Sequence, residues 1–186
     1  MSTSKRNLSV TMTALTAASF GLALATGPAN AALAEPAVVS TADALPIKAL
    51  KISLLEWIGE NSDYDVSSII TNPPVVHFCE RGRPFTYEGK VINFDETIRG
   101  IYDETTKEIC LAKPWDASNT EDIGVLLHEL AHHVQFENRL WLCGQKTEWQ
   151  AYKLQEAWLQ ERDIDPEFNW VYIYMSSSCS PRDIHP

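Results

Sequence analysis

The stretch from Ser118 to Phe136 combines a helix start signal with apolar residues on two faces. Ser118 and Glu121 have the spacing of a capping box, with Ser118 as the N-cap. An apolar stripe at helical spacing follows, formed by Ile123, Leu127, Leu130 and Val134. Because Val125 and Phe136 flank a second face, we predict a helix that is buried on both sides. Such a helix must lie between other elements of a single core, and this constrains the fold more than any other segment.

Two histidines lie four residues apart in this helix, in the run His128-Glu129-Leu130-Ala131-His132. Residues at this spacing are about 40° apart around the axis, so both imidazoles can point at one metal ion. Both point away from the apolar stripe, which favours a cleft over the core packing that is usual for a buried histidine. Glu129 is turned about 100° further, where its carboxylate can accept a proton from a metal-activated water. We therefore predict His128 and His132 as zinc ligands and Glu129 as a general base, whereas His133 points elsewhere and is not a ligand.

A catalytic zinc needs a third protein ligand and an open position for water. Good helix formers predict a second helix over Thr147 to Arg162, and it contains Glu148 and Glu156. Glu148 falls inside the apolar arc of this helix, where a carboxylate needs a cation or several donors. Glu156 lies beside Lys153 and has the character of a solvated residue with a partner three positions away. Glu148 is therefore our predicted third ligand.

Glu148 and Tyr152 each have an alternative explanation. Thr147 and Gln150 also have capping-box spacing, and the helix dipole favours a glutamate in the first turn, so Glu148 has an explanation that needs no metal. Tyr152, one turn after Glu148, is a candidate for stabilising an oxyanion, with packing in the core as its alternative. The metzincin pattern is excluded, because it would require glycine and histidine where this chain has Gln135 and Asn138.

From Cys110 to Leu159 the chain resembles the gluzincin class of zinc peptidases, in which a glutamate on a later helix completes a His-Glu-x-x-His site. The run that begins Glu148-Trp-Gln-Ala is similar to the Glu-x-x-Ala segment of small secreted bacterial proteins with this motif. The resemblance implies a zincin-like fold, Zn²⁺ as cofactor, and Ile109 to Ala112 as the edge strand that pairs with an extended substrate. It departs from the thermolysin pattern because the Asn-Glu-x-x-Ser-Asp signature is missing, and the substrate class does not carry over.

The first residues of the chain have the three parts of a secretory signal peptide. Lys5 and Arg6 precede an apolar stretch over residues 14–25, and Ala-x-Ala sites place cleavage after residue 31 or 34. The apolar stretch is too short to predict a membrane span. We predict residues 1–34 as the signal, residues 35–186 as a single domain, and a secreted or periplasmic location without membrane attachment after cleavage.

All four cysteines of the chain follow this predicted signal: Cys79, Cys110, Cys143 and Cys179. An even set in an exported protein predicts two disulfides, for which three pairings are possible. We favour Cys79 with Cys110 and Cys143 with Cys179, and the sequence does not decide between the pairings. Cys-x-x-Cys spacing is lacking, which argues against a structural zinc site.

The remaining patterns predict an α+β fold. An amphipathic helix is expected over residues 46–59, and short strands over residues 75–78, 90–94, 99–102 and 108–111. The last two strands form a hairpin, and the helices discussed above follow them. We expect a small antiparallel or mixed sheet packed on the motif helix and on the helix that carries Glu148.

The predicted function is that of an exported zinc-dependent hydrolase, above all a peptidase acting on peptide or protein substrates. A formal net charge of −10 disfavours nucleic acid and anionic lipid as partners. One alternative is a secreted, non-catalytic zinc-binding protein, although a structural site needs no base at Glu129 and is usually closed by a fourth ligand. Another alternative is a zinc amidase that acts on cell-wall amides, which no residue separates from a peptidase. Substrate specificity and oligomeric state stay open.

Overall fold

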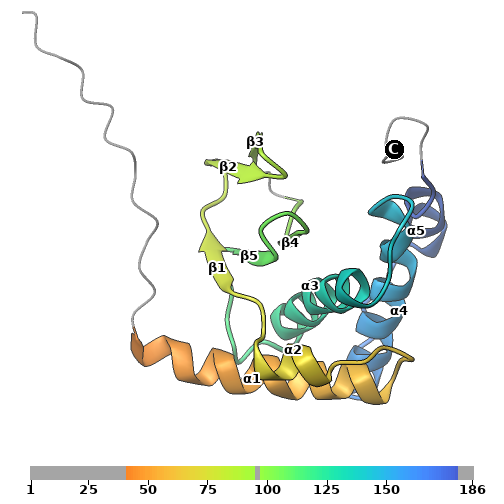
Figure 1. Ribbon diagram of the computed structural model, residues 1–186, viewed down its shortest axis with the longest axis horizontal. Helices are drawn as coiled ribbons and strands as arrows, with labels where there is room; N and C mark the ends of the chain where they lie inside the picture. The colour runs from red at the N-terminus through yellow and green to blue at the C-terminus, as the bar shows by residue number, and fades with distance from the viewer. Residues whose placement is uncertain (1–40, 95–96, 180–186) are drawn as a thin grey trace, which may run out of the picture. The chain divides into compact units, whose positions relative to one another are not determined.

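The computed structural model describes residues 41–94 and 97–179 (Figure 1). The predicted signal peptide lies outside the described residues. The elements follow in the order α1 (Thr41–Glu60), α2 (Ser67–Thr71), β1 (Val76–Cys79), β2 (Pro84–Tyr87), β3 (Lys90–Asn93), β4 (Gly100–Asp103), β5 (Glu108–Ala112), α3 (Thr120–Asn138), α4 (Gln145–Gln160) and α5 (Trp170–Ser176). This order confirms the predicted α+β class. Within the described part, no helix is long and apolar enough to cross a membrane.

A three-stranded mixed sheet has the strand order β1-β5-β4. β4 and β5 are antiparallel, as the predicted hairpin requires, and β1 runs parallel to β5. β5 is therefore the central strand, and the expectation that residues 109–112 form a substrate-pairing edge is wrong. Four of its five residues, Ile109, Cys110, Leu111 and Ala112, are buried, which is the continuous apolar run of a strand that is covered on both faces. The open edge beside the helices belongs to β4.

A second, two-stranded sheet consists of β2 and β3. A strand was expected at β3 but not at β2, which begins at Pro84 directly after a turn that ends at Arg83. The hairpin is attached to the main sheet through a small apolar cluster in which Phe85 and Phe94 pack edge to face. Asp103 also fastens it, because its buried carboxylate accepts a hydrogen bond from the Glu88 amide (2.8 Å).

The motif helix α3 packs against α4, β4 and α1 (Figure 1). Every residue from Gly124 to Gln135 is buried, so the prediction of a helix buried on both sides is confirmed. The predicted N-cap is wrong by one residue. Asn119 caps the helix by accepting hydrogen bonds from the amides of Glu121 and Asp122, and the hydroxyl of Ser118 bonds to Asp116 instead.

The second predicted helix also begins earlier than expected. α4 starts at Gln145 after Gly144, so Thr147 lies inside the first turn and is not the N-cap. Its hydroxyl donates to the Gly144 carbonyl (2.6 Å), which removes the capping-box explanation for Glu148. The first predicted helix, residues 46–59, is confirmed within the longer α1, which buries Leu54, Leu55 and Ile58.

Both favoured disulfides are present. Cys79 is bonded to Cys110, with a Cα–Cα distance of 5.9 Å, and Cys143 to Cys179, with a distance of 5.8 Å. The first joins the neighbouring strands β1 and β5, and the second ties the segment after α5 to the start of α4. Two disulfides are typical of proteins that fold in an oxidising compartment.

Removing the second disulfide is expected to destabilise the protein substantially. The bond spans 36 positions, so the paired change Cys143→Ser and Cys179→Ser frees a long loop in the unfolded chain. We expect the free energy of unfolding to fall by about 2–5 kcal/mol. Urea unfolding of the variant beside the wild type measures this change, and equal midpoints and slopes would contradict it.

Candidate metal site

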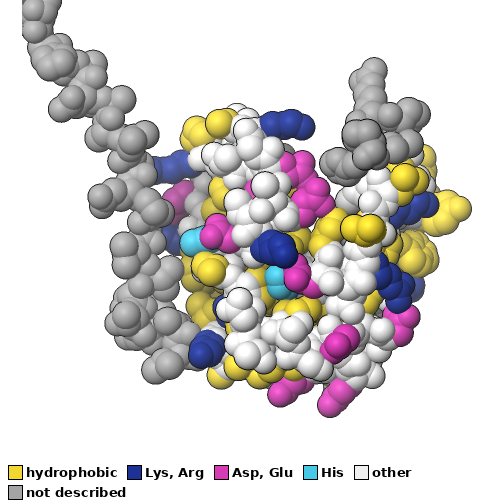
Figure 2. Space-filling view, in the orientation of Figure 1, with side chains coloured by type: hydrophobic (Ala, Val, Ile, Leu, Met, Phe, Trp, Pro, Cys, Tyr) yellow, Lys and Arg dark blue, Asp and Glu magenta, His cyan; other side chains and the backbone are white. Residues whose placement is uncertain are grey.

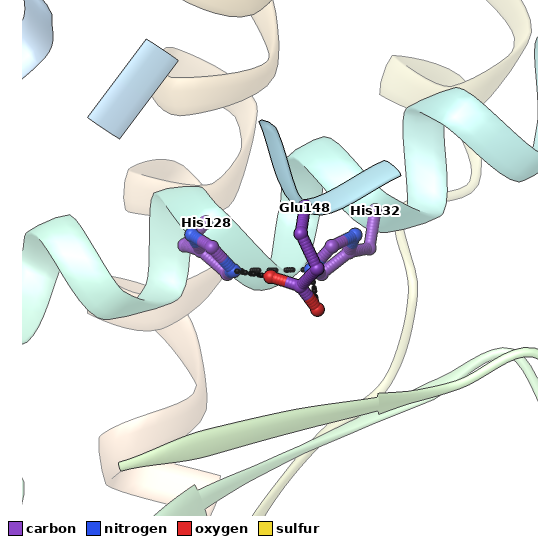
Figure 3. A group of neighbouring side chains, drawn as sticks. All are labelled: His128, His132 and Glu148. Atoms are coloured by element: carbon purple, nitrogen blue, oxygen red, sulfur yellow. Dashed lines mark hydrogen bonds and ion pairs between the residues drawn. The ribbon is translucent and has the colours of Figure 1, made fainter. Parts of the chain in front are cut away.

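Three side chains from two helices converge on one point (Figure 3). His128 and His132 project from α3 with their Nε2 atoms 3.0 Å apart. Glu148 reaches between them from α4, with Oε2 3.4 Å from Nε2 of His128 and Oε1 3.5 Å from Nε2 of His132. One ligand atom from each residue lies within 4.8 Å of the others. The structure thus brings together the three residues predicted as metal ligands.

The Nδ1 atoms of His128 and His132, on the ring side away from the shared point, lie within hydrogen-bond distance of polar side chains. Nδ1 of His128 lies 3.1 Å from Oε1 of Gln155. Nδ1 of His132 lies 3.2 Å from Oε1 of Gln135 and 2.9 Å from Oγ1 of Thr147. Hydrogen bonds at Nδ1 fix the ring orientations and leave Nε2 facing the shared point. No role of this kind was predicted for Gln155, Gln135 or Thr147.

The donor set fits a zinc ion. Two imidazole nitrogens and one carboxylate oxygen are the three-ligand combination that catalytic zinc sites use, with one position left open. The three residues also line a cavity of about 710 Å³, so the shared point is accessible to a small molecule. Glu88 and Glu104 line the same cavity, and Figure 2 shows acidic side chains on the side of the strand region that faces α4.

The charges of the three residues are strongly coupled. Burial alone would raise the pKa of Glu148, but its hydrogen bond with His128 and the charges of both histidines hold that pKa at about 2. Burial disfavours the charged form of His128, yet Glu148 and Glu129 outweigh this effect and raise its pKa. Burial and the neighbouring charge of His128 lower the pKa of His132 to about 4. A negative carboxylate therefore faces two imidazoles, and His132 is neutral at neutral pH.

Glu129 lies against the edge strand β4. Its side chain is buried and accepts a hydrogen bond from the backbone amide of Tyr102. Burial raises its pKa to about 7; the charge of His128 opposes the rise, and that of Glu148 adds to it. This close approach requires Gly100, because a Cβ atom there would lie 2.6 Å from Oε1 of Glu129 and 2.9 Å from Cγ1 of Val125.

Gly100→Ala is expected to lower the free energy of unfolding by about 1–3 kcal/mol, since α3 and β4 cannot separate without disturbing the core. Gly144→Ala is the matched control at another cavity-lining glycine, because the nearest atom to its added Cβ is 4.0 Å away. Chemical denaturation measures both variants. Equal losses of stability would contradict a specific steric role for Gly100.

Tyr152 stands beside the candidate ligands. Its ring centroid is 4.4 Å from that of His128 and 5.1 Å from that of Phe168, and both aromatic residues line the cavity. Burial raises the pKa of its phenol to about 12, and the charges of Glu148 and Glu129 contribute. The phenol therefore keeps its proton at neutral pH and is a hydrogen-bond donor close to the site.

His133 lies apart from the three candidate ligands, as predicted. Its Nδ1 atom is 3.2 Å from the hydroxyl of Tyr102, and the two rings meet edge to face. Glu156, the rejected alternative to Glu148, forms an ion pair with Lys153 (3.1 Å) and accepts a hydrogen bond from Nε1 of Trp170.

Comparisons with known proteins give a family and no named relative. No curated protein and no solved structure matches the chain. A family model described as Domain of unknown function (DUF6647) matches residues 43–186, which include all the elements from α2 onward and the candidate metal site. The chain belongs to the DUF6647 family.

Proposed function

We propose that this protein is an exported, zinc-dependent hydrolase that cleaves peptide bonds. The observation that carries the proposal is the convergence of His128, His132 and Glu148 on one point of an open cavity, with the buried Glu129 next to the first ligand. Three protein ligands and an accessible fourth position are typical of catalytic zinc, whereas structural zinc is usually closed by four ligands.

A zinc ion held by these residues would supply a Lewis acid that makes water nucleophilic near neutral pH. In this proposal Glu129 would accept the proton of this water and pass it to the leaving amine. Tyr152 would be the donor that stabilises the negative charge developing on the carbonyl oxygen, since its ring packs on His128 and lines the cavity.

The edge strand β4 offers backbone groups to an extended peptide. The carbonyls of Arg99 and Asp103 accept hydrogen bonds from Ala112 and Lys107, on the β5 side of the strand. Backbone groups alternate along an antiparallel strand, so those of Gly100 and Tyr102 point away from β5. The Tyr102 amide donates to Glu129, which leaves the groups of Gly100 and the carbonyl of Tyr102 for a substrate. This side of β4 lines the cavity. We infer that a substrate pairs with β4, in place of the β5 segment expected from the sequence.

The test begins with zinc content. Wild-type protein and His132→Ala are dialysed exhaustively against metal-free buffer, and zinc per mole of protein is measured by elemental analysis. One zinc in the wild type and none in the variant are expected. Zinc absent from both would refute the proposal.

A peptide library then tests the reaction on the zinc-loaded protein. Cleavage that disappears in His132→Ala is expected. Zinc binding without cleavage of any peptide would instead favour a non-catalytic zinc-binding protein, and cleavage of cell-wall amides alone would favour an amidase.

A further inference from the structure

Gln135 is fully buried on α3 and contacts both helices of the metal site. Its Oε1 atom lies 3.2 Å from Nδ1 of His132, one turn earlier on the same helix. Its Nε2 atom donates to the backbone carbonyl of Thr147 (3.0 Å), the residue directly before Glu148. One amide side chain therefore joins a candidate ligand on α3 to the backbone that carries another on α4.

The direction of this amide is fixed by its partners. A carbonyl can only accept, so the group that faces Thr147 must be the NH₂ of Gln135. Oε1 then faces His132 and must accept a hydrogen bond from Nδ1–H. The hydroxyl of Thr147 donates to the Gly144 carbonyl, so it too can only accept from His132. Both contacts require a proton on Nδ1 of His132, so in the neutral ring the Nε2 lone pair faces the point shared with His128 and Glu148.

Gln155 is the matching amide at the other histidine, and it makes fewer hydrogen bonds at the site than Gln135 does. Its Oε1 atom contacts Nδ1 of His128 (3.1 Å), and it comes from the helix that already carries Glu148. No hydrogen bond of the Gln155 side chain to the α3–α4 connection is found among the described residues. The two glutamines thus provide a natural comparison, because each orients one imidazole and links α3 to α4, whereas Gln135 also bonds to the backbone directly before Glu148.

We propose that Gln135 is a positioning residue that sets the tautomer of His132 and holds Glu148 at the distance from it that metal binding needs. The inference rests on the metal site of the proposed function and not on hydrolysis. It implies that the ligand geometry is assembled before the metal arrives, so losing Gln135 weakens metal binding without removing any ligand.

The test compares Gln135→Met with Gln155→Met in a Co²⁺ titration followed by visible absorption. Gln135→Met is expected to lower Co²⁺ affinity about 10- to 100-fold and to alter the spectrum of the bound ion, with a smaller loss for Gln155→Met. In a Glu148→Ala background the loss caused by Gln135→Met is expected to shrink, because the ligand it positions is gone. Equal losses in the two glutamine variants, or full additivity with Glu148→Ala, would overturn the proposal.

Two further measurements distinguish positioning of the ligands by Gln135 from a purely structural role of this residue. Ile58→Ala removes a buried side chain of α1 and serves as a destabilised control that should bind Co²⁺ like the wild type. If Gln135→Met does not fold, nitrogen NMR of the His132 ring in metal-free wild type still decides, because a proton on Nε2 with none on Nδ1 would overturn the proposal. Should the wild type bind no metal at all, the proposed function fails, while the NMR result continues to test the role of Gln135.

Discussion

Glu129→Gln is expected to reduce peptide hydrolysis by at least about 100-fold while zinc stays bound. The amide has the size of the carboxylate but cannot take up a proton from water and release it to the leaving amine. Glu129 is not among the residues that converge on the metal position, so its replacement leaves all three ligands in place. The measurements are kcat/KM on a peptide found in the library and zinc per mole of the same sample.

The control is Glu121→Gln, which makes the same chemical change on the exposed first turn of α3. It should keep the activity and the zinc content of the wild type. Wild-type activity in Glu129→Gln would remove the general base from the mechanism. Loss of zinc together with activity would show instead that Glu129 supports the metal site itself.

The sequence was most informative where one periodic pattern dominated. The apolar spacing over residues 118–136 predicted α3, and the direction of His128 and His132 relative to the stripe predicted that both face a cavity. The position of Glu148 in the apolar arc of α4 placed it beside them. These positions depend on the directions of side chains around a helix axis and on one helix facing another. Helix geometry was therefore sufficient to predict the three candidate ligands.

The side chains that hydrogen-bond to Nδ1 of the two histidines could not be predicted from helix geometry. Gln135 follows His132 by three positions, a visible signal, but nothing in the sequence says that its amide meets the Thr147 carbonyl. That contact depends on how the α3–α4 connection folds back, and on α4 beginning at Gln145. Polar residues at buried positions acquire their partners only from the tertiary structure.

The order of the strands was a second failure, with consequences for the site. The run from Ile109 to Ala112 is apolar throughout, which is typical of a strand buried on both faces, and this strand is the central one. The expectation of an edge there came from the resemblance and not from the residues. Gly100 was the better signal for the true edge, since a glycine within a strand often marks a close approach by another element.

Glu148→Ala is expected to weaken zinc binding by more than about 100-fold, beyond the loss that is typical for an outer partner of a ligand. The alanine removes one of three donors and leaves two imidazoles, whose Nε2 atoms lie 3.0 Å apart, without the negative charge that faces them. Competition with a chelator of known affinity measures the change.

Glu156→Ala is the matched control, two turns further along the same helix. Its carboxylate binds Lys153 and Trp170 outside the site, so zinc affinity should stay within a few-fold of the wild type. Equal weakening in both variants would mean that α4 as a whole supports the metal and that Glu148 is not its ligand. A selective loss in Glu148→Ala would leave two histidines and one glutamate as the protein ligands, and a fourth position free for water and substrate.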